Sequence, residues 1–146
     1  MRTGGRTFEA AAFLRRAGAD TAEVKRLFQN ALEGAIAKYS IIQHAKMYRE
    51  GIAVAVVDHT VGRITAAQAA DELLNISGVD ASIVVAPDGN GGSFASARSI
   101  GELNVQLIME KVGGGGNRSA AAAQFAGTDV NTAVKRIYAA IDDYLG

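Results

Sequence analysis

Residues 96 to 99 form the first of two segments whose groups could bind a phosphate. In order they are Ser96, Ala97, Arg98 and Ser99. They fall at the end of an expected strand, where alternate side chains share a face, so Ser96 and Arg98 point the same way and Ala97 points to the other side. A hydroxyl beside a guanidinium suits a phosphate or a carboxylate. From these residues alone, an arginine that merely pairs with a surface carboxylate stays open as the alternative.

The second segment is a glycine run with polar residues behind it: Gly113, Gly114, Gly115 and Gly116, then Asn117, Arg118 and Ser119. Glycines let a backbone approach an anion closely. We expect N–H groups of this loop and of the first turn of a following helix to converge on an anion, with Arg118 adding charge from the side. Asn117 offers an amide donor and an acceptor. The alternative is a flexible loop without a ligand.

No arrangement of catalytic side chains can be argued elsewhere in the chain. The only histidines are His44 and His59, too few to build a two-metal centre with the neighbouring Asp58. Asp58 and His59 are interpreted as a strand end entering a turn, and His44 as a boundary residue of a long helix. Asp142 and Asp143 are adjacent on a helix and so point in different directions. We therefore assign no catalytic residue and no metal ligand.

The composition predicts one globular domain, or two at most. The chain has 146 residues, of which 49% are hydrophobic, and its 15 basic and 15 acidic side chains balance to a net charge of zero. A neutral chain lacks the field that holds a long polyanion such as duplex DNA. Cysteine is absent, which excludes disulfides and thiolate zinc sites. With no signal peptide visible and no apolar run long enough to cross a bilayer, we expect a cytoplasmic piece cut from a larger protein.

Helical and extended patterns alternate along the chain and predict an α/β fold, a mixed β-sheet flanked by helices with a long N-terminal connecting helix. The expected helices are 8–16 ended by Gly18, one from an Asp20 cap to about Arg49, 66–76, 105–111 with Asn104 as cap, and one opening at Asp129. The expected strands are 52–57, 81–86 and 93–98, the last two joined as a hairpin by the turn 87–92. Residues 120–126 are ambiguous, a helix passing into a strand.

The two segments together form a longer pattern that resembles a known family. It comprises the 96–99 segment, Gly101, Asn104, Val105, Ile108, Glu110, Lys111, the glycine run and the small residues after it. In this the chain resembles the DHHA1 domain of DHH/DHHA1 phosphoesterases, with most likeness to GdpP-type cyclic-di-AMP phosphodiesterases. Residues 1–18 resemble the end of the preceding DHH half with its linker helix, and 19–146 the DHHA1 domain.

The resemblance implies a substrate-binding half-enzyme that is inactive alone. In the family the DHHA1 domain holds the nucleotide, while the DHH half supplies manganese ligands and the attacking water. The family arginine corresponds to Arg98 and its glycines to Gly113 through Gly116, so the implied ligand is cyclic-di-AMP, its linear product pApA or a short RNA. Where the family has a histidine after the glycines, this chain has Asn117. The implied partner is the DHH domain of the same parent, which can itself be membrane-anchored.

Two other functions stay open at this point. DHHA1-like domains also occur in alanyl-tRNA synthetases, so an RNA-contacting accessory module is the first alternative, although the zero net charge argues against a basic RNA-binding face. The second is a structural domain with a decayed pocket that packs on its partner half or forms a homodimer.

Overall fold

A computed structural model describes residues 21–146 of the chain. The chain divides into two units between Tyr39 and Ser40, and every residue of the two candidate segments lies in the second unit. The expected helix 8–16, its Gly18 stop and the Asp20 cap fall outside the described residues. No helix within the described range is long and apolar enough to cross a membrane.

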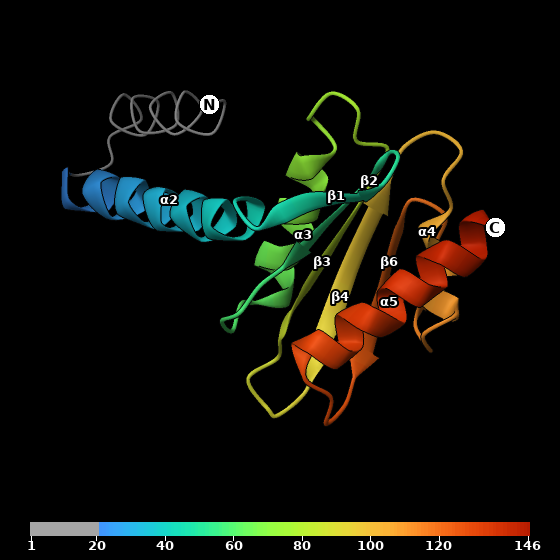
Figure 1. Cartoon of the computed structure of the whole chain (residues 1–146). Helices are drawn as coiled ribbons and strands as arrows, with labels where there is room; N and C mark the ends of the chain where they lie inside the picture. Colours follow the sequence, from blue (N-terminus) through green and yellow to red (C-terminus); the bar gives the residue numbers. More distant parts are fainter. Residues whose placement is uncertain (1–20) are drawn as a thin grey trace. The chain divides into compact units, whose positions relative to one another are not determined.

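The described elements are helices and strands that follow one another along the chain (Figure 1). In chain order they are α2 (Thr21–Ile42), β1 (Ala45–Arg49), β2 (Ile52–Val56), α3 (Arg63–Leu73), β3 (Ala81–Pro87), β4 (Ser93–Ser99), α4 (Val105–Glu110), β5 (Gly115–Gly116), β6 (Ala120–Phe125) and α5 (Val130–Leu145). The six strands form one sheet in the order β1-β2-β3-β4-β6-β5. Only β2 and β3 run parallel, joined through α3, and every other pair is antiparallel. The expected mixed α/β sheet is therefore confirmed.

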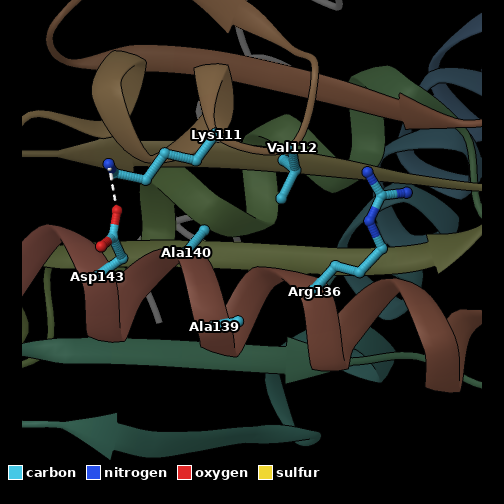
Figure 2. A pocket seen from close by; sticks show the side chains of 6 residues that line it. All are labelled: Lys111, Val112, Arg136, Ala139, Ala140 and Asp143. Carbon is cyan, nitrogen blue, oxygen red and sulfur yellow. Dashed lines mark hydrogen bonds and ion pairs between the residues drawn. The ribbon is translucent and has the colours of Figure 1, made fainter.

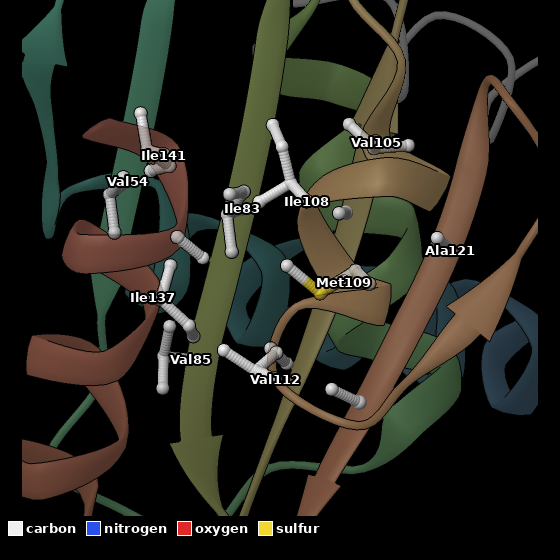
Figure 3. Packing of buried hydrophobic residues seen from close by; sticks show 14 of the residues in the cluster. Val54, Ile83, Val85, Val105, Ile108, Met109, Val112, Ala121, Ile137 and Ile141 are labelled. Carbon is white, nitrogen blue, oxygen red and sulfur yellow. The ribbon is translucent and has the colours of Figure 1, made fainter. Parts of the chain in front are cut away.

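The two faces of the sheet carry separate hydrophobic cores. On one face α4 and α5 pack over Val54, Ile83, Val85 and the inward residues of β4 and β6, as Figure 3 shows. On the other face α3 packs through its alanines and Leu73 against Val84 and Phe94. Strand alternation separates the two sets: Ala95 and Ala97 belong to the first core, and Phe94 to the second. Ser96 and Arg98 therefore point to the α3 face, as the alternation predicts.

The long helix ends seven residues earlier than expected. It stops at Ile42, and residues 45–49, expected as its last turns, form the edge strand β1. Gly51, expected as a helix stop, has φ +84° between β1 and β2 instead. Tertiary contacts favour the strand: Tyr48 stacks on Tyr138 of α5 with ring centroids 4.0 Å apart, and its hydroxyl donates to Asp142 at 2.8 Å. Such long-range contacts override a local helical pattern.

The helix expected to begin behind the glycines does not form. Residues 120–125 are a complete strand, β6, paired with β4 along its length and with β5 at its start. An alanine run has high helix propensity, but here the chain follows the alternating burial of a strand, with Ala121, Ala123 and Phe125 facing the α4–α5 core. The small side chains of Ala121 and Ala123 let α4 lie close to the sheet.

The remaining elements agree with expectation apart from small shifts at their ends. The 81–86 and 93–98 strands form the expected hairpin, since β3 and β4 pair antiparallel from Ala81↔Ser99 to Pro87↔Ser93. The helix expected at 66–76 lies three residues earlier, at 63–73. Both expected caps are present: Asn104 accepts from the Leu107 N–H, and Asp129 accepts from the Thr132 N–H.

Candidate functional site

Strand β6 lies between the two candidate segments. In the register of the sheet, Ser96 of β4 lies opposite Ala122, and Ala122 lies opposite Gly115 of β5. Two strand spacings of about 4.8 Å each separate the outer residues, so Ser96 and Gly115 are about 10 Å apart across the sheet. Ala122 is exposed, whereas Ser96 is only 6% exposed. The row therefore forms a floor of small residues on the α3 face, buried at Ser96 and exposed at Ala122.

Arg98 stands beside this floor, opposite Ala120. Its Nε lies 3.2 Å from Oδ1 of Asp71 on α3, and its Nη1 donates to the Ala97 carbonyl at 2.9 Å. The surface-carboxylate pair that the sequence left open is thus present. The Asp71 side chain is 61% exposed and that of Arg98 is 21% exposed, and a surface ion pair of this kind contributes only about 0.2–1 kcal/mol. A phosphate with several acceptor oxygens can therefore compete with Asp71 for Arg98.

Ser99 and Arg118 hold the backbone together and do not face the floor. Ser99 points into the opposite face, where its Oγ donates to the Arg118 carbonyl at 3.0 Å. The Arg118 guanidinium donates to the carbonyls of Gly101 at 3.2 Å and Glu102 at 3.1 Å. These bonds fix the loop before α4 against the turn before β6. Ser99 and Arg118 are therefore candidate residues with a structural role, because both bond to backbone groups of this chain.

The four glycines differ in why their positions require glycine. Gly113 has φ +86° at the end of α4, a conformation that favours glycine. A Cβ on Gly114 would lie 2.2 Å from the Ala122 carbonyl oxygen, and one on Gly116 would lie 2.4 Å from that of Ala120. Gly115 has neither constraint, because a Cβ there would meet nothing within 4 Å. Three of the glycines are thus required by packing or torsion, while Gly115 is open toward the floor.

Most of the N–H groups expected to bind an anion instead donate to backbone carbonyls of the protein. The Gly114 N–H donates to Met109 at 2.8 Å, the Gly113 N–H to Glu110 at 3.2 Å, and the Asn117 N–H to Ala120 at 2.8 Å. No helix follows to add further donors. The run is therefore a packed turn leading into an edge strand, and neither the slack loop nor the full anion cradle considered from the sequence describes it.

The Asn117 side chain closes the turn between β5 and β6. Its Oδ1 accepts from the N–H groups of Ser119 at 3.0 Å and Ala120 at 2.9 Å, and from the Ser119 hydroxyl at 3.3 Å. This Asx-type turn uses the acceptor half of the amide. The donor half, Nδ2, is the part of Asn117 that remains to offer a ligand a hydrogen bond, because the amide is exposed.

The histidines flank one carboxylate. Nδ1 of His59 lies 3.1 Å from Oδ1 of Asp58, and Nε2 of His44 lies 3.9 Å from it. The hydrogen bond with His59 is the largest of the effects that hold the pKa of Asp58 below its ordinary value. His44 follows α2 in a turn and is half-buried, so it is a boundary residue, although not in mid-helix. Across residues 21–146, no group of three or more His, Asp and Glu side chains could hold a metal ion, so the described residues do not fit a manganese centre.

One pocket lies on the opposite face of the sheet, between the end of α4 and α5 (Figure 2). It has a volume of about 290 Å³, an apolar floor that includes Val112 and Ala140, and an ion pair of Lys111 with Asp143 at one end. Arg136 lies at the other end, its guanidinium 5.1 Å from the Phe125 ring centroid. None of the candidate residues lines this pocket, so we do not place the site there.

Sequence reasoning missed a polar cluster at the far end of the floor. Arg63, the first residue of α3, donates to Oε1 of Gln124 and lies 4.8 Å from the centroid of the Phe94 ring. Gln124 in turn donates to Oδ2 of Asp88 at 2.7 Å. The backbone N–H of Asn90 is the foremost of several groups that lower the pKa of Asp88, so its carboxylate is ionised. These residues come from three distant segments, and no spacing in the sequence connects them.

Comparison with known proteins agrees with this architecture. The family model of the DHHA1 domain matches residues 49–145. The cyclic-di-AMP phosphodiesterase GdpP of Bacillus subtilis is 42% identical over 99% of this chain, and the cyclic-di-AMP phosphodiesterase PdeA of Listeria monocytogenes is also 42% identical over 99%. The chain spans only 22% of the length of each of these relatives.

Among solved structures, an exopolyphosphatase-related protein from Bacteroides fragilis shares the fold. Its TM-score is 0.66 at 22% identity, over 90% of this chain and 41% of that one. A pGpG-specific phosphodiesterase, PggH from Vibrio cholerae, aligns with a TM-score of 0.56 at 19% identity, over 86% of this chain and 47% of the other. The match to the family model and the identity to these relatives lead to one conclusion: the chain belongs to the DHHA1 domain family of DHH-type phosphoesterases.

Proposed function

We propose that this chain is the nucleotide-binding part of a phosphodiesterase that acts on cyclic-di-AMP or on short linear nucleotides such as pApA. The observation that carries the proposal is the floor on the α3 face, where Ser96, Ala122 and Gly115 lie in one row with Arg98 beside them. A floor of small residues lets a bulky ligand lie close to the backbone, and a guanidinium at its margin supplies charge for a phosphate. Two relatives that are 42% identical to this chain are cyclic-di-AMP phosphodiesterases.

Each residue has a distinct role in the proposal. Arg98 leaves Asp71 and binds phosphate oxygens, because the Asp71 carboxylate is 61% exposed and its surface ion pair with Arg98 is weak. Gly115 leaves room for the ligand where any side chain would stand on the floor. The Nδ2 group of Asn117 donates a neutral hydrogen bond at the edge. Ser99, Arg118 and the other glycines position these groups and do not touch the ligand.

We further propose that the chain binds the nucleotide without cleaving it. The metal ions expected for the chemistry, manganese in this family, belong to the DHH half of the parent, since the described residues do not fit such a centre. That half is the proposed partner of this chain. Hydrolysis by the purified 146-residue chain, dependent on manganese and surviving repurification, would contradict this part of the proposal.

Isothermal titration of the purified chain with cyclic-di-AMP, pApA, AMP, adenosine and a short RNA tests the binding. Binding of pApA or cyclic-di-AMP that Arg98→Ala weakens, with little effect on adenosine, is expected. The matched control is Arg136→Ala, which removes an arginine from the opposite face and should leave affinity unchanged. Absence of binding to either nucleotide at millimolar concentration overturns the proposal, and preference for RNA with a steep salt dependence would favour the RNA-contacting alternative.

A further inference from the structure

The guanidinium of Arg63 is held at the margin of the floor by an aromatic ring and a side-chain amide. Its Cζ lies over the Phe94 ring, 4.8 Å from the ring centroid, and Phe94 is only 1% exposed. Its edge donates to Oε1 of Gln124, which lies directly opposite Phe94 in the sheet. Gln124 is in turn held by Asp88. Arg63 itself is exposed, and it lies over Phe94, on the face of the sheet to which Arg98 also points.

Helix formation does not explain an arginine at this position. Arg63 is the first residue of α3, and the first turn of α3 contains no acidic residue. A cation there opposes the helix macrodipole, whose positive end lies at the N-terminus. Gly62, the N-cap, provides no side-chain hydrogen bond either. The contacts that hold Arg63 are those with Phe94 and Gln124, which orient its plane.

The charges around Arg63 favour a neutral flat group over a second phosphate. The carboxylate of Asp88 belongs to the same hydrogen-bonded chain through Gln124, and the attraction between Arg63 and Asp88 contributes to the low pKa of that carboxyl. The positive charge of Arg63 is therefore partly offset locally. A planar guanidinium whose edge is already bonded still offers its open face, and nucleobases stack on such planes.

The distance between Phe94 and Arg98 along β4 indicates which base of a nucleotide ligand would stack on Arg63. Phe94 and Arg98 are four residues apart on the same face of β4, which is about 13 Å along the strand. A ligand that contacts both arginines must cover this span, and the second base of a dinucleotide lies farther from a given phosphate than that nucleotide's own base does. We propose that Arg63 is a specificity-determining residue on which the second base of a dinucleotide stacks while Arg98 holds a phosphate. This inference rests on the proposed function and adds to it a preference for dinucleotides over mononucleotides.

The test compares pApA with AMP on three variants of the full 146-residue chain by isothermal titration. Loss of one stacked base predicts that Arg63→Ala weakens pApA binding roughly 5- to 150-fold while AMP affinity stays within about twofold. Arg63→Lys keeps the charge without the plane, so it should be nearly as weak as Arg63→Ala. Arg136→Ala, which removes the other arginine on an aromatic ring, is the matched control and should bind pApA like the wild type.

The outcomes separate this inference from the proposed function. Unchanged pApA binding by Arg63→Ala, with loss by Arg98→Ala, overturns the stacking role and leaves the proposed function intact. Rescue by Arg63→Lys would mean that charge alone acts, and equal losses for AMP and pApA would place the first base there. Each result overturns the inference. A wild-type chain that binds neither ligand overturns both proposals, and thermal unfolding of each variant confirms that it is folded.

Discussion

Ser96 and Gly115, separated by 18 residues in the chain, lie opposite the same residue, Ala122, from either side of strand β6. This shared pairing joins the serine-arginine segment and the glycine run into one surface. It also sets them about 10 Å apart, two strand spacings, so the surface suits a ligand broader than a single phosphate.

Removing the carboxylate that pairs with Arg98 should strengthen phosphate binding. Asp71→Asn frees the Arg98 guanidinium, now 3.2 Å from the Asp71 carboxylate, and an exposed pair of about 0.2–1 kcal/mol corresponds to roughly a 1.5- to 5-fold gain in affinity for pApA. Titration calorimetry at low salt measures the affinity of Asp71→Asn and of the wild type for pApA. A weaker complex with Asp71→Asn would show instead that Asp71 positions Arg98 for the ligand.

The glycines should respond differently to alanine. Gly114→Ala and Gly116→Ala place a Cβ against backbone atoms of β6 and should each lower the free energy of unfolding by about 1–3 kcal/mol or more. Gly115→Ala, with open space around its Cβ, should change it by less than about 1 kcal/mol. Urea denaturation of the three variants measures these differences.

A larger side chain at Gly115 tests whether the ligand approaches β5. Gly115→Val adds a side chain to the floor, and should remove pApA binding from a chain that still unfolds cooperatively. Unchanged affinity for Gly115→Val would show that the ligand does not approach β5.

Asn117→Asp separates the two halves of the Asn117 amide. Aspartate keeps the oxygen that accepts from Ser119 and Ala120, so the turn and the melting temperature should stay near those of the wild type. It loses the donor and adds a negative charge, and should weaken phosphate binding by about 1–3 kcal/mol. Equal affinity would remove Asn117 from the ligand contacts, and a large drop in melting temperature would show that the amide nitrogen has a structural role.

Asn117→His replaces the neutral amide donor with a donor that can carry a positive charge. A protonated histidine donates a charge-assisted hydrogen bond, so this variant should bind pApA more tightly below pH of about 6.5 than above it. The wild type, with a neutral amide, provides the control titration over the same pH range.

Acid should loosen edge strand β1 from α5. The Asp142 carboxylate accepts from the Tyr48 hydroxyl at 2.8 Å and from Arg49 at 2.9 Å, and the bond from Tyr48 is the largest cause of its lowered pKa. A carboxyl with a lowered folded-state pKa stabilises the fold above its unfolded-state pKa of about 4, and this contribution disappears as the pH falls through the folded-state value.

Amide exchange in β1 checks this prediction. Protection of β1 should drop as the pH falls below about 4, and Asp142→Asn should show the loss already at pH 7. Asp143→Asn, which removes the adjacent ion pair with Lys111, is the charge-matched control and should leave β1 protected. Identical exchange in both variants would mean that the Asp142 contacts do not hold β1.

Local signals in the sequence determined much of the fold. The apolar run at 52–56 and the turn residues at 87–92 gave the buried strand and the hairpin, and Asn104 and Asp129 marked the starts of two helices. These features depend on neighbours within a few residues, so composition and spacing are sufficient to predict them. Alternation in β4 likewise assigned Ser96 and Arg98 to one face.

Tertiary structure decided what depends on distant partners. Residues 45–49 and 120–125 have helical or ambiguous patterns, yet pairing with β2 and β4 makes both of them strands. The identity of the carboxylate beside Arg98, the difference between Gly115 and its neighbours, and the Arg63–Gln124–Asp88 chain all follow from the register of β4, β5 and β6 and from the packing of α3. Residue types and spacing identified the candidate groups, but only the folded sheet determined which of them face a ligand, because long-range pairing sets the direction of each side chain.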